Sequence, residues 1–499
     1  MIVKKNQFLS IFFYLISFVL MIFAIFTEAE EALLSVSVTI ILIANICYLW
    51  DEFQKNILLI MFQLTFFLFL ISGVFIQTLN QGNYFTMFNP SEIAETMICY
   101  WMAASSMWLY ILFRSRIKIK KNSRENITDE LKKSTIPYSG YQFNDVLQKI
   151  SKWMFYLCSV AYLANIVDKI VFRFTHTLQA YYAGYISSLP TLFVKLGDCF
   201  LISFMLFLAT KPSKKRALFP IVIYVFLSIM TLLYGVRNVF VLNIMFLIMY
   251  GTARNLDNKE KWITRKMVNI GILFLPVSII LLQAFDTIRR NAGFSIDLLG
   301  ELFSWDLVKE FFISQSVSSQ ILPNAIINMD VLGGQPVPYT FGTLYTYLTQ
   351  NMLVRFFTGQ AAYTANSVEG AFQSGNLGSR LAYEMYEETY LAGTGMGGCF
   401  VADLYVDFSY IGIIIGTIVL MIFINILSKG YFTASPYKDA FLFVGWRWIL
   451  YTPRDSYFSW AMQAFSFMNI IYVIAVYLLV SEIARRKGYR KFTSLKREY

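Results

Sequence analysis

The sequence predicts an all-α, polytopic membrane protein with about 12 transmembrane helices and one large, partly helical extracytoplasmic loop. Three observations support this fold class. Of the 499 residues, 57% are hydrophobic and only 15% are charged, well below the roughly 25% charged residues of soluble domains. The mean hydropathy is +0.55. Apolar runs close to the roughly 20 residues that a helix needs to cross a bilayer recur along the whole chain.

The predicted spans are apolar runs separated by short polar or charged segments. They cover residues 8–26, 33–50, 57–76, 93–113, 153–172, 191–210, 217–234, 237–252, 267–285, 399–427, 439–452 and 457–481. The first span follows Lys4 and Lys5 but is too long for the apolar core of a signal peptide, and it lacks a small-x-small cleavage site. We therefore expect an uncleaved anchor.

The orientation follows from the basic residues, which are enriched in cytoplasmic loops. With the amino terminus inside, the cytoplasmic segments hold 31 of the 42 lysines and arginines. We therefore expect both termini in the cytoplasm. The net charge of +11 then reflects topology rather than a nucleic-acid-binding surface, so we expect membrane lipids and no nucleic acid as partners.

Three parts follow along the chain. Residues 1–285 hold transmembrane helices one to nine, with a basic cytoplasmic loop at 114–152. Residues 286–396 form an extracytoplasmic loop that folds over the outer mouth, because so long a connector is improbable without structure. Residues 397–499 hold helices ten to twelve and a basic cytoplasmic tail. Tyrosines cluster in the outer loop beside amides and carboxylates, which suits sugar binding; the alternative is an interfacial aromatic belt.

Metal and nucleotide chemistry have no support in the sequence. The five cysteines lie singly in predicted spans without a CxxC pair, and the only histidine is His176, so we predict no zinc site. The chain has no P-loop, no GxGxxG motif and no DxD motif. We predict no cofactor and no metal.

Arginines in sequence-distant segments are predicted to gather at the outer face, against the charge bias of the rest of the chain. They are Arg237 at the start of a span, Arg289 and Arg290 at the exit of the ninth span, Arg380 in the outer loop and Arg454 in the last outer turn. A guanidinium matches phosphate with two parallel hydrogen bonds and stays charged, and a helix amino terminus favours anions. The pattern therefore predicts a diphosphate clamp; the alternative is that each arginine pairs with a nearby acid or reaches lipid headgroups.

Carboxylates accompany these arginines. Asp403 and Asp407 are four residues apart and share one face of a helix, and Glu384 lies in the outer loop. Each is a candidate to orient a sugar hydroxyl or to accept its proton. The alternative is that they cap and solvate the start of a span.

Four segments of this chain resemble the Wzy-type polysaccharide polymerases, which polymerise O-antigen-like and capsular repeat units. They are "YGVRN", "FDTIRRN", "GTGMGGCFVADLYVDFSYIG" and "PRDS", within residues 221–477. The resemblance implies a bacterial cytoplasmic-membrane glycosyltransferase that joins undecaprenyl-diphosphate-linked oligosaccharides outside the membrane without a metal or nucleotide sugar. We expect a GT-C-like architecture. A chain-length-regulating co-polymerase is a further candidate partner.

The resemblance carries the diphosphate role onto the arginines in the matching motifs. The family's third motif typically has Glu where Asp403 stands and Gly where Ser409 stands. The related O-antigen ligases imply a histidine in the outer loop, which this loop lacks, so a polymerase is favoured over a ligase. A lipid-linked oligosaccharide flippase or another transporter is the remaining alternative, although two related halves, usual in such proteins, are not evident.

Overall fold

The computed structural model describes residues 5–27, 31–80, 82–125, 138–176, 180–181, 184–257, 260–290, 305–359, 363, 366–429 and 435–487. Every regular element in these residues is a helix, and the described residues contain no strand. The all-α prediction is thereby confirmed.

Nine helical segments of the described chain are long and apolar enough to cross a membrane, which indicates a multi-pass membrane protein. They are Lys5–Phe26 (α1), Glu31–Trp50 (α2), Phe53–Leu79, Pro90–Arg114, Phe143–Thr175, Thr191–Ala209, Lys214–Tyr234, Phe400–Ser428 and Ser459–Arg486. Many large apolar side chains of these segments face outward, among them Leu15, Val222 and Leu478. A soluble monomer rarely exposes such an apolar surface, whereas a lipid-facing surface requires one.

Several of these segments are composed of consecutive helices. The segments that follow α2 contain α3 (Phe53–Phe66), the π-helix η1 (Phe67–Ile71), α4 (Ser72–Leu79), α5 (Pro90–Glu125), α6 (Tyr138–Thr175), α8 (Thr191–Asp198), α9 (Phe200–Ala209), α10 (Lys214–Met230) and η3 (Thr231–Tyr234). The last two segments contain α20 (Phe400–Lys429), α22 (Ser459–Ala464) and α23 (Phe467–Arg486).

Three further predicted spans are helices of a different character. They are α11 (Arg237–Arg254), α12 (Arg265–Arg290) and α21 (Pro436–Ile449). α11 has an arginine at each end, and α21 has only 14 residues. The total of twelve spans therefore stays a prediction, as does the GT-C-like architecture.

The described residues between α12 and α20 fold largely into short helices. These are α14 (Trp305–Gln315), η5 (Ser316–Gln320), α15 (Ile321–Ile327), α16 (Tyr339–Thr349), α17 (Met352–Thr358), α18 (Val368–Gln373) and α19 (Leu377–Leu391). The turns η4 (Asn255–Asp257) and η6 (Thr452–Arg454) complete the structure.

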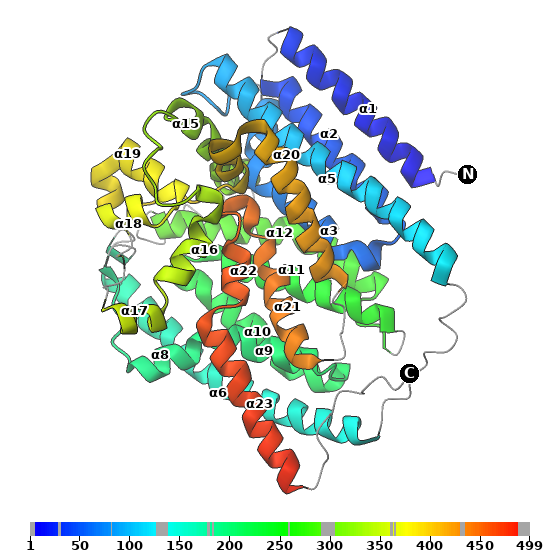
Figure 1. Ribbon diagram of the computed structural model, residues 1–499, viewed down its shortest axis with the longest axis vertical. Coiled ribbons are helices and arrows are strands. Elements are labelled where there is room, and N and C mark those ends of the chain that lie inside the picture. Colours follow the sequence, from blue (N-terminus) through cyan, green and yellow to red (C-terminus); the bar gives the residue numbers. More distant parts are fainter. Residues whose placement is uncertain are drawn as a thin grey trace.

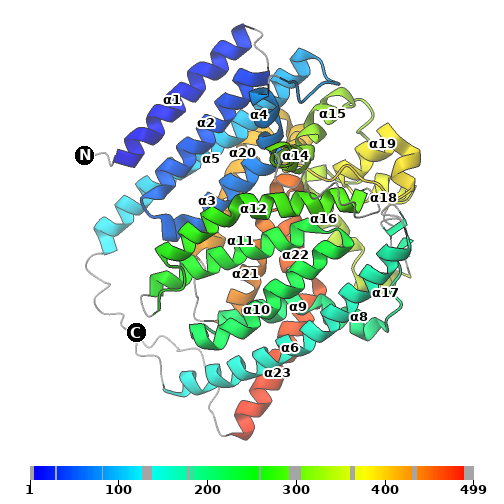
Figure 2. The same ribbon diagram turned by 180° about the vertical axis from the view of Figure 1, so that it is seen from behind.

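The arrangement separates two sides of the molecule. In both views, α17, α18 and α19 lie together on one side, whereas the start of α1 and the far end of α5 lie on the opposite side (Figures 1 and 2). The membrane-length helices pack between them: α2 lies against α1 and α5, α20 against α5, and α21 against α9. We call the side of α17–α19 the loop side.

Candidate functional site

Arg237 lies in the first turn of α11 because the chain reverses sharply just before it. Gly235 has φ 97°, a left-handed conformation that glycine adopts without steric cost. Val236 then occupies the N-cap position without a side-chain hydrogen bond to the helix. The partial positive charge of the helix terminus therefore adds to that of the guanidinium.

A buried glutamine connects Arg237 to α14. The Arg237 Nη1 atom donates to Oε1 of Gln283 on α12 at 3.4 Å. The Gln283 Nε2 atom donates to Glu310 at 3.3 Å, and the Ser314 hydroxyl donates to Gln283 Oε1 at 3.5 Å. Arg237 is thereby linked to the last turn of α14.

Arg454 reaches the same turn from the other end of the chain. Its Nη1 atom donates to the backbone oxygen of Gln315 at 3.2 Å, and its guanidinium carbon lies 5.7 Å from the centre of the Phe69 ring. Gln315 directly follows Ser314. Arg454 therefore contacts the end of α14 directly, whereas Arg237 is connected to the preceding residue, Ser314, through Gln283. We call Arg237 and Arg454 the arginine pair.

The other predicted arginines lie elsewhere or only partly within the described structure. Arg380 is 8% exposed; it pairs with Glu384 at 2.9 Å, donates to the Val331 oxygen at 2.9 Å, and lies 3.5 Å above the Phe372 ring. These contacts hold α19 in place. No contact of the described residues links Arg380 to the arginine pair.

Arg289 and Arg290 are the last two residues of α12, and their side chains lie outside the described structure. Arg289 follows Gln283 by six helical residues, which corresponds to about 9 Å along the axis. From Gln283, which contacts Arg237, α12 therefore continues to Arg289 and Arg290 at its end.

The predicted carboxylates of α20 bind backbone groups of two other segments. Asp407 accepts from the Tyr339 and Thr340 amides at 2.9 and 2.6 Å, and from the Thr340 hydroxyl at 2.6 Å. Asp403 is 1% exposed and accepts from the Tyr457 amide at 3.1 Å. Asp407 thus caps the start of α16 rather than the start of its own span, and a role of either carboxylate as base stays a prediction. Glu384 differs, since 24% of its side chain is exposed.

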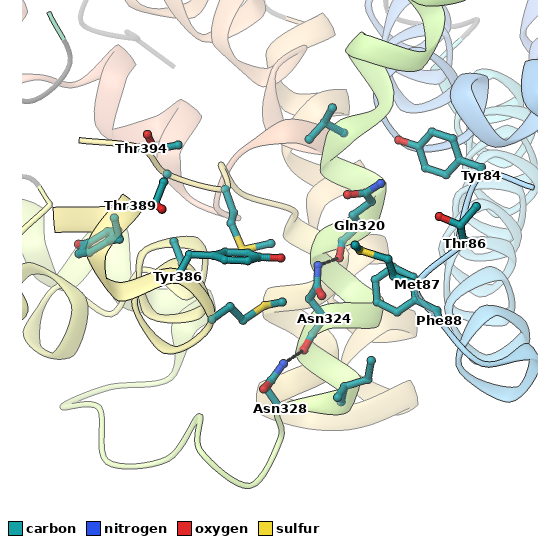
Figure 3. Close-up of a pocket in the computed structure, with 17 residues that line it drawn as sticks. Tyr84, Thr86, Met87, Phe88, Gln320, Asn324, Asn328, Tyr386, Thr389 and Thr394 are labelled. Carbon is teal, nitrogen blue, oxygen red and sulfur yellow. Dashed lines mark hydrogen bonds between the residues drawn. The ribbon is translucent and has the colours of Figure 1, made fainter. Parts of the chain in front are cut away.

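A cavity of about 460 Å³ lies between the 84–88 loop, the η5–α15 segment and α19. Figure 3 shows Tyr386 pointing across it toward Gln320 and Asn324. All of its lining residues are uncharged: they are apolar, aromatic, hydroxyl or amide residues and one glycine. The cavity is therefore suited to a neutral polar ligand rather than to a diphosphate.

Tyr84 connects the cavity to the arginine pair, and sequence reasoning missed it. Its ring lines the cavity. Burial raises the pKa of the Tyr84 phenol, and the positive charge of Arg454 acts in the opposite direction. Its backbone amide donates to Glu31 at 2.8 Å. Nothing in the local sequence distinguishes Tyr84 from the other tyrosines, because its neighbours come from distant segments.

Arg447 of α21 is a second residue to which the sequence analysis assigned no role. It is 3% exposed, donates through Nε to Asn243 of α11 at 2.5 Å and lies 4.5 Å from the Trp448 ring centre. Because Asn243 is on the same helix as Arg237, this contact helps to fix α11 within the bundle.

Among the described side chains, no group of three or more His, Cys, Asp or Glu residues is placed to hold a metal ion. Metal independence of the activity stays a prediction. His176 packs against Phe172, with ring centres 4.1 Å apart, on the protein exterior.

Comparison with known proteins gives one result that covers almost the entire chain. A family model described as O-antigen polysaccharide polymerase Wzy matches residues 8–487. No curated protein and no solved structure matches significantly.

Proposed function

The chain belongs to the Wzy family of O-antigen polysaccharide polymerases, and we propose that it joins undecaprenyl-diphosphate-linked oligosaccharide repeat units outside the cytoplasmic membrane. The match confirms the resemblance drawn from the four short motifs. The observation that carries the site assignment is that Arg454 directly, and Arg237 through Gln283, are connected to adjacent residues in the last turn of α14.

The reaction transfers a growing glycan onto an incoming lipid-linked unit. A hydroxyl of the incoming unit attacks the anomeric carbon of the growing chain and forms the new glycosidic bond. The bond from that carbon to the diphosphate oxygen breaks, and lipid diphosphate leaves with the electron pair. The hydroxyl proton passes to a base. The enzyme must therefore bind the diphosphate as negative charge builds on it, align two sugars and accept one proton.

The arginine pair suits the first of these tasks. Two guanidinium groups from different helices can each offer two parallel hydrogen bonds to phosphate oxygens, and the α11 amino terminus adds its dipole. We propose that Arg289 and Arg290 extend this site from the end of α12. Arg380 remains a fifth candidate, although its present contacts hold α19.

We propose Glu384 as the first candidate for the base, followed by Asp403 and Asp407. Glu384 is partly exposed and lies on α19, between cavity-lining residues Ala382 and Met385. Its ion pair with Arg380 orients the carboxylate. Asp407 would first have to release the two backbone amides that its oxygens bind, and Asp403 is 1% exposed.

The direct test is polymer formation by the purified protein. We expect the protein in nanodiscs to convert the lipid-diphosphate-linked repeat unit into a ladder of longer glycans on a gel, without nucleotide sugar and with a chelator present. Absence of a ladder from folded protein with authentic substrate would contradict the proposal and favour a flippase or a ligase that needs a separate acceptor.

The same assay tests the role of Arg237. We expect Arg237→Lys to slow chain growth by about 10²-fold or more, because a single ammonium cannot replace the planar fork of a guanidinium at a leaving group. The matched control is Arg485→Lys, an exposed arginine on α23 that pairs with Glu482 at 2.9 Å and should retain full activity. Wild-type polymer length in Arg237→Lys would refute the assignment.

A further inference from the structure

The uncharged cavity beside α15 has no role in the phosphate chemistry just described. Its lining contains amides, hydroxyls and aromatic rings but neither a cation nor an anion. An anionic ligand would lose its water there without gaining an opposite charge. A ligand rich in hydroxyl groups would instead meet donors and acceptors of matching strength.

Several of these polar groups are available to a ligand. In the described part of the chain, the side-chain amide of Gln320 and the hydroxyls of Thr86, Tyr386 and Thr389 have no hydrogen-bond partner. Since each can donate and accept, the cavity wall offers several unused hydrogen-bonding positions.

Two asparagines of the α15 wall are held so that their amide oxygens stay available. Asn324 Nδ2 donates to the Gln320 backbone oxygen at 2.7 Å, and Asn328 Nδ2 donates to the Asn324 backbone oxygen at 2.8 Å (Figure 3). Each amide nitrogen is thereby used within the chain. Both side chains also line the cavity, where their oxygens can accept from hydroxyl groups.

Tyr386 supplies an aromatic surface on the opposite wall. The helical course of α19 is interrupted at this residue, which has φ −146° and ψ 56°. The Tyr386 side chain leaves the helix at this break, is 50% exposed and points across the cavity (Figure 3). A half-exposed ring opposite amides is a surface on which the apolar face of a sugar ring can pack.

The cavity wall begins two residues after Gln315, the residue that Arg454 contacts. Arg454 and, through Gln283, Arg237 bind residues 314–315, and the cavity wall continues along the same segment from Val317 to Asn328. At 1.5 to 2.0 Å per residue this wall is roughly 16–20 Å long. A ligand whose diphosphate lies at the arginine pair could therefore extend its glycan along it.

We propose that this cavity is a glycan subsite that binds neutral sugars of the oligosaccharide attached to the diphosphate at the arginine pair. The subsite rests on the proposed function and selects the repeat unit: the side chains of Gln320, Asn324 and Asn328 form hydrogen bonds with sugar hydroxyls, the two asparagines through their amide oxygens as acceptors, and Tyr386 packs against a sugar ring.

The test measures binding of the free glycan, so that it does not depend on catalysis. The repeat-unit oligosaccharide, released from its lipid diphosphate by mild acid, is titrated into the purified protein in a calorimeter. We expect Tyr386→Ala and Gln320→Ala each to weaken binding roughly tenfold, as loss of one aromatic or buried polar contact does. Tyr386→Trp, which keeps a ring, should retain most of the affinity.

Two controls separate this subsite from the arginine pair. Glu388→Ala changes an exposed residue of α19 outside the cavity and should leave affinity unchanged. Arg237→Lys should also bind the free glycan normally, because the probe has no phosphate. If a polymer ladder forms but Tyr386→Ala and Gln320→Ala bind as wild type, or if wild type fails to bind millimolar glycan, the subsite proposal is wrong and the polymerase proposal stands.

The reverse result is equally distinguishable. If no ladder forms while glycan affinity follows the cavity variants as expected, the cavity is a glycan site of a protein with another activity. With the lipid-linked substrate, Tyr386→Ala should raise KM roughly tenfold with little change in kcat, since a distal contact contributes equally to ground and transition state.

Discussion

Ser409 has a backbone conformation that residues other than glycine rarely adopt. Its φ of 55° and ψ of −152° interrupt α20 two residues after Asp407, in a region populated almost only by glycine. The resemblance to the Wzy-type polymerases implies glycine at this position, and the observed geometry supplies a physical reason. The sequence alone showed Ser409 as a departure from the motif but gave no sign of the interruption.

Ser409→Gly should therefore stabilise the protein. We expect a gain of about 1 kcal/mol, because relief of roughly 1–3 kcal/mol of strain exceeds the extra unfolded-state entropy of glycine. Thermal unfolding in detergent measures the change. Ser481→Gly, at a regular helical position of α23, is the matched control and should lower stability. Equal losses in both variants would contradict the strain at Ser409.

Single residues also show what the sequence could reveal about the site. The arginines were recognisable because charge is costly near a membrane. Gln283, Ser314 and Gln315, which bring Arg237 and Arg454 together, were not, since neutral polar residues carry no such signal. Gln320, Asn324 and Asn328 are spaced four residues apart, and that spacing could have indicated a polar face on α15.

At the scale of elements, α19 depends on a close approach between backbones. A Cβ on Gly378, in the first turn of α19, would lie 1.6 Å from the backbone oxygen of Gly397 in the segment before α20. The start of α19 therefore fits against this segment only without a side chain. That contact positions both Arg380 and Tyr386.

Gly378→Ala should displace α19 and reduce both stability and glycan binding. We expect a loss of about 1–3 kcal/mol, as for overpacked cores, measured by thermal unfolding together with glycan titration. Gly271→Ala on α12 is the control, because a Cβ there meets no atom within 4 Å and alanine favours a helix. Unchanged stability and binding in Gly378→Ala would contradict a requirement for close packing between the backbones at Gly378 and Gly397.

The pattern of apolar residues predicted the positions of helices better than it predicted the contacts between helices. Most membrane-length helices follow from the apolar runs of the sequence. That Asp403 and Asp407 share a helical face was also predictable. Their partners, the Tyr457 amide and the start of α16, were not, because long-range packing leaves no local pattern.

At the scale of the whole molecule, the distribution of basic residues predicts that α17–α19 face away from the cytoplasm. The described structure places the start of α1 and the far end of α5 opposite these helices (Figures 1 and 2). This separation agrees with the prediction that the outer loop and the basic cytoplasmic segments lie at opposite sides of the molecule. The direction of insertion stays a prediction.

Cysteine labelling of intact cells tests that direction. Glu388→Cys on α19 should react with a membrane-impermeant maleimide. Lys55→Cys lies between the second and third predicted spans, on the predicted cytoplasmic side, and its native side chain is 59% exposed; it should react only after lysis. Four of the five native cysteines are buried, so background labelling should be low. The opposite pattern would overturn the proposed topology.

The central claim is that Arg237 and Arg454 hold one leaving diphosphate, and a double-mutant cycle on the rate of chain growth tests it most directly. Residues that act on one group are non-additive, so we predict that Arg237→Lys with Arg454→Lys is little slower than the worse single variant, with a coupling of about 1 kcal/mol or more. Fully additive losses from the two substitutions would contradict a shared diphosphate site.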